Sequence, residues 1–148
     1  MPKTTTLLVA LLAIAVAMPA FAPAGAASEN PERVSFTSGS VRETFIATAY
    51  GGIEDATAVS PTPVAVRRLR AHMRQGAKAF ARGSFVDPTN PHGDLVPGLR
   101  EMHGQWNKMQ VRYADLPTGA RITYVTHDPV MVEALHQWFV ARAVNKIR

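Results

Sequence analysis

Histidine is the residue type in this sequence best suited to chemistry, because the chain contains five histidines and no cysteine. A neutral imidazole is the usual ligand of copper, zinc, nickel or haem iron, and carboxylate and methionine side chains can complete such a site. The densest local group is His92-Gly93-Asp94, with Met102-His103 a little further on. The candidate ligands for a transition metal ion or a haem are His92, His136, His72, His103 and Asp94.

Each candidate histidine also has an ordinary structural interpretation. His92-Gly93 lies among prolines and could shape a turn, while His72 and His136 could each lie at a helix boundary with one nitrogen in water. The spacing matches no known metal signature, and no pair has the i, i+4 geometry of a His-Glu-x-x-His zinc site. The sequence therefore nominates these residues as ligands and leaves a structural role open.

The sequence shows no motif of a common enzyme class. There is no glycine-rich phosphate loop, no Gly-x-Gly-x-x-Gly, no Gly-x-Ser-x-Gly, and no pair of carboxylates flanked by apolar residues. Cysteine nucleophiles, thiolate metal sites and iron–sulfur clusters are excluded because the chain has no cysteine. An acid, a base and a nucleophile cannot be nominated together, so the sequence favours a protein without catalytic activity.

The first 27 residues are typical of a cleavable secretory signal. Lys3 precedes an apolar run over residues 7–18, and Ala-x-Ala sites follow at Ala20/Ala22 and Ala24/Ala26. The apolar run is too short for a stable membrane anchor, so no membrane span is expected after cleavage. We expect a periplasmic or secreted protein of 121 residues, in which loss of Lys3 leaves 15 basic and 11 acidic side chains, a net charge of +4.

After the signal, the sequence predicts a flexible arm or short edge strand over residues 28–40 and a single α+β domain over residues 41–148. Two alternating stretches within residues 44–59 flank Gly51-Gly52, which predicts a two-residue hairpin turn. The face expected to support a helix carries Phe45, Ala47, Ala49, Ala56 and Ala58. Thr62-Pro63 then predicts a helix start, and apolar residues recur at steps of three and four as far as Phe80.

The C-terminal half repeats this plan. Strands are expected over residues 109–114 and 121–126, a short helix over residues 99–107, and a long helix beginning at Asp128-Pro129. A shift of 66 residues aligns Pro63 with Pro129 and Leu69 with Leu135. Residues expected to face the core in the first unit thus align with residues expected to face the core in the second. We therefore expect two β-hairpin-plus-helix units that form one four-stranded antiparallel sheet with two long helices on one face.

The first long helix carries six cations and no acid. They are Arg67, Arg68, Arg70, Arg74, Lys78 and Arg82. Such a face can meet an acidic protein or another anionic surface, or it can simply be solvated. Because no aromatic residue is interleaved with the cations, there is no specific nucleic-acid signal.

Several segments resemble a family of small uncharacterised exported bacterial proteins. The resemblance covers nearly the whole mature chain and is carried by Phe45-Ile46-Ala47-Thr48-Ala49-Tyr50-Gly51-Gly52, Leu69-Arg70-Ala71-His72-Met73, Phe80-Ala81-Arg82-Gly83-Ser84-Phe85, His92-Gly93, Val96-Pro97-Gly98 and Ala134-Leu135-His136-Gln137-Trp138-Phe139. It implies that His72, His92 and His136 recur in the family. Some members carry the label aspartate carbamoyltransferase. That activity is not expected here, because it needs two α/β domains and a Ser-Thr-Arg-Thr-Arg loop that the chain lacks.

The sequence thus predicts an exported protein that binds a metal ion or small cofactor through histidines. The alternative is a protein-interaction module that presents the basic helix or an open sheet face and has no catalytic activity. The sequence does not determine the oligomeric state.

Overall fold

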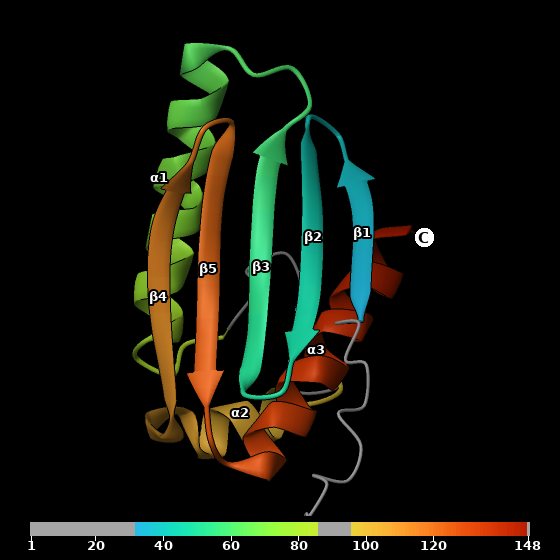
Figure 1. Ribbon diagram of the computed structural model, residues 1–148, viewed down its shortest axis with the longest axis vertical. Coiled ribbons are helices and arrows are strands. Elements are labelled where there is room, and N and C mark those ends of the chain that lie inside the picture. Colours follow the sequence, from blue (N-terminus) through green and yellow to red (C-terminus); the bar gives the residue numbers. More distant parts are fainter. Residues whose placement is uncertain (1–31, 86–95, 148) are drawn as a thin grey trace, which may run out of the picture.

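The computed structural model describes residues 32–85 and 96–147, which form one antiparallel sheet with helices behind it (Figure 1). The strands are β1 (Arg33–Ser38), β2 (Val41–Thr48), β3 (Gly51–Ala58), β4 (Met109–Leu116) and β5 (Gly119–Thr126), in the order β1-β2-β3-β5-β4. The helices are α1 (Pro63–Phe80), α2 (Leu99–Gly104) and α3 (Pro129–Ile147), with a 3-10 turn, η2, over Trp106–Lys108. The predicted α+β class and antiparallel sheet are confirmed.

The sheet has five strands within the described residues, one more than the sequence predicted. The additional strand is β1, which pairs antiparallel with β2 at the edge of the sheet. Phe36 explains why this segment joins the sheet, because its side chain is buried with its ring centroid 6.0 Å from that of Phe45. Residues 33–38 are therefore an edge strand and not a flexible arm, while the proposed signal segment lies outside the described residues.

Both long helices begin where the sequence predicts. The Thr62 hydroxyl accepts a hydrogen bond from the backbone N–H of Ala65, and Pro63 occupies the first turn of α1, where no intrahelical N–H is needed. Asp128 does the same for α3, because its Oδ1 accepts from the backbone N–H groups of Val130 and Met131 at 3.0 and 3.2 Å. These caps fix the point at which each apolar helix face meets the sheet.

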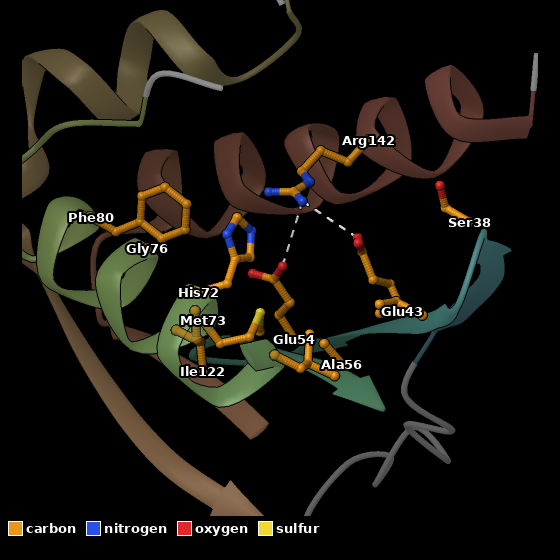
Figure 2. Close-up of a pocket in the computed structure, with 12 residues that line it drawn as sticks. Ser38, Glu43, Glu54, Ala56, His72, Met73, Gly76, Phe80, Ile122 and Arg142 are labelled. Atoms are coloured by element: carbon orange, nitrogen blue, oxygen red, sulfur yellow. Dashed lines mark hydrogen bonds and ion pairs between the residues drawn. The ribbon is translucent and has the colours of Figure 1, made fainter. Parts of the chain in front are cut away.

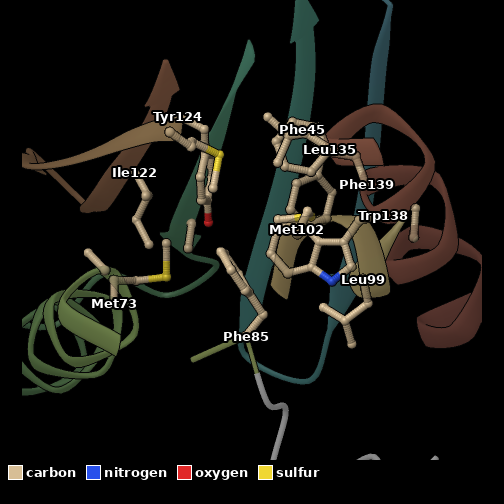
Figure 3. Close-up of a cluster of buried hydrophobic side chains, with 14 of the residues drawn as sticks. Phe45, Met73, Phe85, Leu99, Met102, Ile122, Tyr124, Leu135, Trp138 and Phe139 are labelled. Carbon is tan, nitrogen blue, oxygen red and sulfur yellow. The ribbon is translucent and has the colours of Figure 1, made fainter. Parts of the chain in front are cut away.

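The core lies between the inner face of the sheet and the two long helices (Figure 3). Leu69 of α1 and Leu135 of α3, which the 66-residue shift aligns, are both buried. Trp138 and Phe139 pack against Tyr124 of β5, with ring centroids 6.0 and 5.8 Å away. Burial of each large apolar side chain contributes about 1.5–3 kcal/mol, so the shared core holds the two halves together.

The first hairpin turns earlier than predicted. The turn is at Ala49-Tyr50, and β3 already begins at Gly51, so Phe45 pairs with Glu54. Gly51 and Gly52 do not form the turn. Glycine is needed at these positions because β5 and α3 pack closely against them. A Cβ at Gly51 would lie 2.1 Å from the Tyr124 carbonyl oxygen, and a Cβ at Gly52 would lie 2.3 Å from the Phe139 ring. The inward and outward faces remain as predicted, because this change of register preserves the alternation of side chains.

Each long helix covers strands of the other half of the chain. The helix α1, which follows β3, packs chiefly on β5 and β4, whereas α3, which follows β5, packs on β1, β2 and β3 (Figure 1). The described helices leave the opposite face of the sheet uncovered. On that face Arg121 forms a bidentate ion pair with Asp55, in which Nε donates to Oδ1 at 2.7 Å and Nη2 donates to Oδ2 at 2.8 Å. Among the described helices, none is long and apolar enough to cross a membrane.

Candidate functional site

A cavity of about 220 Å³ lies between α1, α3 and the inner face of the sheet (Figure 2). One part of its wall is apolar and the other is polar and charged. The apolar lining comes from Val41, Ala56, Leu69, Met73, Phe80 and Ile122. The polar lining comes from Ser38, Glu43, Glu54, His72 and Arg142. An apolar cavity of about 150 Å³ holds a benzene molecule, so this volume suits a ligand of similar or slightly larger size.

The strand register places two glutamates on the inner face of the sheet. Glu54 lies opposite Phe45, and Glu43 lies opposite Ala56, so both carboxyls point towards the helices. Glu54 is only 2% exposed, which is unusual for a carboxyl group. A buried carboxyl needs compensating partners, because removing its charge from water is costly.

Arg142 of α3 supplies the opposite charge. Its Nη2 lies 3.4 Å from Oε2 of Glu43 and 3.6 Å from Oε1 of Glu54, so one nitrogen lies between the two carboxyls (Figure 2). The guanidinium also lies over the rings of Phe45 and Trp138, at 5.5 and 5.1 Å from their centroids. Arg142 is thus held by aromatic faces while it compensates charge from β2 and β3.

Tyr124 completes the set from β5. Its hydroxyl donates a hydrogen bond of 2.7 Å to Oε2 of Glu54, and both side chains are fully buried. Burial raises the pKa of Glu54, and the charge of Arg142 and the Tyr124 hydrogen bond oppose that rise. Burial and the neighbouring Glu54 also raise the pKa of Tyr124 well above its ordinary value, so the phenol stays protonated and acts as a donor.

His72 reaches the cavity from α1. Its side chain is exposed and lines the wall near Glu54, where any positive charge on the imidazole lowers the pKa of Glu54 slightly (Figure 2). Among the described lining residues, Glu43 and Glu54 supply two carboxyl groups and Arg142 supplies one guanidinium group. The cavity therefore combines an apolar wall with a charged wall that has an excess of acceptor oxygens.

The Tyr124–Glu54 hydrogen bond can be tested by Tyr124→Phe. Removing the hydroxyl deprives a buried carboxyl of its donor, and we expect the free energy of unfolding to fall by about 1–3 kcal/mol in urea denaturation at neutral pH. Tyr50→Phe is the matched control, because Tyr50 is 63% exposed and its variant should stay within about 0.5 kcal/mol of wild type. Equal effects at the two positions would show that the buried hydrogen bond does not contribute.

The other two described candidate histidines have separate partners. Nε2 of His136 lies 2.8 Å from the carbonyl oxygen of Gly51, and Nδ1 of His103 lies 3.0 Å from that of Gly83. A carbonyl oxygen only accepts hydrogen bonds, so these two nitrogens carry the protons. Only Nδ1 of His136 and Nε2 of His103 are left as metal ligands in the neutral imidazoles.

Within residues 32–85 and 96–147, no three histidine, aspartate or glutamate side chains are grouped so that they could hold a metal ion. His92 and Asp94 lie outside the described residues. A metal or haem site that combines them with His72, His103 and His136 therefore stays a prediction. Of the three described candidates, His72 lines the cavity, whereas His103 and His136 do not.

Two of the six cations that the sequence assigns to the first long helix are structural. Arg70 donates from Nε to the carbonyl oxygen of Gly119 at 3.1 Å and from Nη2 to that of Leu116, and Arg74 pairs with Asp115 at 3.3 Å. They therefore join α1 to the end of the β4–β5 hairpin. The remaining four cations are exposed on α1 and just beyond its end: Arg67, Arg68, Lys78 and Arg82.

Glu43, Glu54 and Arg142 are not among the site residues predicted from the sequence. A usable signal was present for Glu54, because it alternates with Ala56 and Ala58 on the face predicted to be inward. No local pattern joins Glu54 to Arg142, since their proximity depends on α3 crossing to the strands of the first half.

These features define an α+β protein with a partly open cavity, lined by apolar and charged residues, between two long helices and the sheet. Comparison with family models, with curated proteins and with solved structures finds no match to the chain.

Proposed function

We propose that this protein binds a small organic molecule in the cavity between α1, α3 and the sheet. The observation that carries the proposal is a cavity of about 220 Å³ with apolar residues on one wall and Glu43, Glu54 and Arg142 on another. Binding sites for small molecules are typically mainly apolar concavities with a few polar groups that fix the orientation of the ligand. The carboxyl and guanidinium groups are already positioned by the core, so little ordering is needed when a ligand enters.

The test is to fill the cavity without harming the fold. Gly76 lines the cavity, and a Cβ at this position would meet only Phe80, at 3.9 Å. Gly76→Leu should therefore project into the cavity, while the better helix propensity of leucine adds up to about 1 kcal/mol to stability. We expect it to lower the affinity for any fragment that binds wild type by at least about tenfold in ligand-observed NMR.

Gln75→Leu is the control for this variant. Gln75 neighbours Gly76 on α1 but is exposed and does not line the cavity, so its leucine should leave fragment binding unchanged. The fragment set should contain cationic, anionic and neutral molecules with about five to eight non-hydrogen atoms, matched to the volume of the cavity. Wild-type binding that survives Gly76→Leu would contradict the proposed function.

Export forms part of this proposal. It is supported by the basic, apolar and small-residue segments in the first 27 residues, which favour a periplasmic or secreted location. The N-terminal sequence of protein recovered from a periplasmic extract or from the medium checks this directly. A chain that still begins at Met1 would contradict processing.

A second candidate function is docking of an acidic protein on the exposed cations of α1. The supporting observation is that four exposed cations accompany a helix without any acidic residue. Polyglutamate is a suitable probe: we expect its binding to weaken strongly between about 50 and 200 mM salt. Arg67→Glu/Arg68→Glu should lower the affinity about tenfold, and Arg112→Glu, on β4, is the control. Equal effects of the two variants would contradict a site on α1.

A further inference from the structure

The charges around the cavity discriminate between classes of ligand. Arg142 is the cation of the charged wall, and its Nη2 already lies within 3.6 Å of carboxyl oxygens of both Glu43 and Glu54. An anionic ligand would have to approach this guanidinium past two carboxylates. An anion is therefore disfavoured even though an arginine lines the cavity.

The carboxylates of the charged wall favour a positively charged ligand. When Glu43 and Glu54 are both ionised, one guanidinium compensates two carboxylates among the described lining residues, which leaves one excess negative charge in a partly buried space. Unlike charges attract more strongly there than in water. A ligand with a single positive charge would restore neutrality, and its N–H donors would find acceptors in the carboxylate oxygens and the hydroxyl of Ser38.

The rest of the wall indicates what is attached to that charge. Leu69, Met73 and Phe80 from α1 and Ile122 from β5 line the cavity, and none of them has a polar side-chain group that forms strong hydrogen bonds. Figure 2 shows Met73 beside Ile122. This surface favours an alkyl or aromatic body. A compact body is required by the volume of about 220 Å³.

The geometry points to a small organic ammonium compound as the ligand, with its charged nitrogen beside Glu43 and Glu54 and its apolar body against Met73 and Phe80. This inference rests on the proposed function, since it specifies the class of molecule that occupies the same cavity. Glu43 and Glu54 are then the residues that set the preference for positive charge.

Three probes of nearly equal size test this preference: n-butylammonium, n-butanol and n-butyrate. We expect n-butylammonium to bind wild type at least about tenfold more tightly than either of the others at neutral pH, in line with the strength of charge-assisted hydrogen bonds. Glu43→Gln and Glu54→Gln should each reduce this preference about tenfold. Glu133→Gln, on the exposed side of α3, should not change it.

The ratio of affinities is the informative readout, because a variant that only loosens the fold weakens all three probes together. Tighter binding of n-butanol or n-butyrate, abolished by Gly76→Leu, would overturn the ammonium class and leave the proposed function standing. A preference for n-butylammonium that persists in both Glu43→Gln and Glu54→Gln would also overturn the proposed ligand class. If none of the three probes binds wild type, the ligand class is contradicted. The proposed function is contradicted as well if no member of the fragment set binds wild type.

Discussion

Arg142→Met is expected to lower the free energy of unfolding by about 3 kcal/mol at neutral pH. The substitution keeps a long apolar side chain near Phe45 and Trp138 but leaves Glu43 and Glu54 without their cation. Breaking a buried ion pair from one side costs about 3–5 kcal/mol. We expect the lower end of that range, because 20% of the Arg142 side chain is exposed. Urea denaturation followed by circular dichroism gives the measurement.

The same variant has a defined pH dependence. Glu54 has a raised pKa in the folded protein, so its contribution to stability is complete below its ordinary value of 4.5 and is lost as the pH rises through the raised value. Losing Arg142 removes an opposing influence and raises that pKa further. The destabilisation should therefore be largest at neutral pH and should shrink towards pH 4.5.

Arg112→Met is the matched control for this experiment. Arg112 is exposed on β4 and bonds only to Gln110 among the described partners, so its variant should stay within about 0.5 kcal/mol of wild type at every pH. A penalty at Arg142 that equals the control, or one that grows as the pH falls, would contradict the role assigned to this guanidinium.

Gly119→Ala is expected to cost at least about 3 kcal/mol, the upper end of the range for overpacked interiors. A Cβ at Gly119 would lie 1.8 Å from the carbonyl oxygen of Ala56, which belongs to the neighbouring strand β3. Backbone atoms cannot move aside as a flexible side chain can. The substitution therefore forces β3 and β5 apart at the place where the two halves of the chain join and where Arg70 bonds the Gly119 carbonyl.

Gly104→Ala is the corresponding control. A Cβ at Gly104, at the end of α2, meets nothing within 4 Å, so this variant should have nearly wild-type stability. Urea midpoints of the two alanine variants provide the comparison. Similar midpoints would show that β3 and β5 are not packed as closely as described.

The parts of the fold that depend on local chemistry could be predicted from the sequence. Thr62-Pro63 and Asp128-Pro129 mark the starts of α1 and α3, and most residues of the apolar stripes that follow them are buried. The alternation of side chains also identified the inward face of the first hairpin. These features depend on residues a few positions apart, which is why a single sequence reveals them.

The register and the cavity could not be predicted in the same way. Gly51-Gly52 has the composition of a tight turn, but both glycines are used for contact with β5 and α3, which lie about half the chain away in sequence. Residue type likewise predicted a site made of histidines, whereas the charged wall of the cavity contains Glu54 and Arg142. The partnership of these two residues depends on the crossing of α3 over β3.

The most direct test of the account is a methionine methyl NMR spectrum recorded while the fragment set is titrated into the protein. Met73 lines the cavity, whereas Met102 and Met131 are fully buried and do not line it. We expect the Met73 resonance to shift and saturate with at least one fragment while those of Met102 and Met131 stay in place. A Met73 resonance that no fragment moves, or equal shifts of all three methyl groups, would contradict a ligand site between α1 and α3.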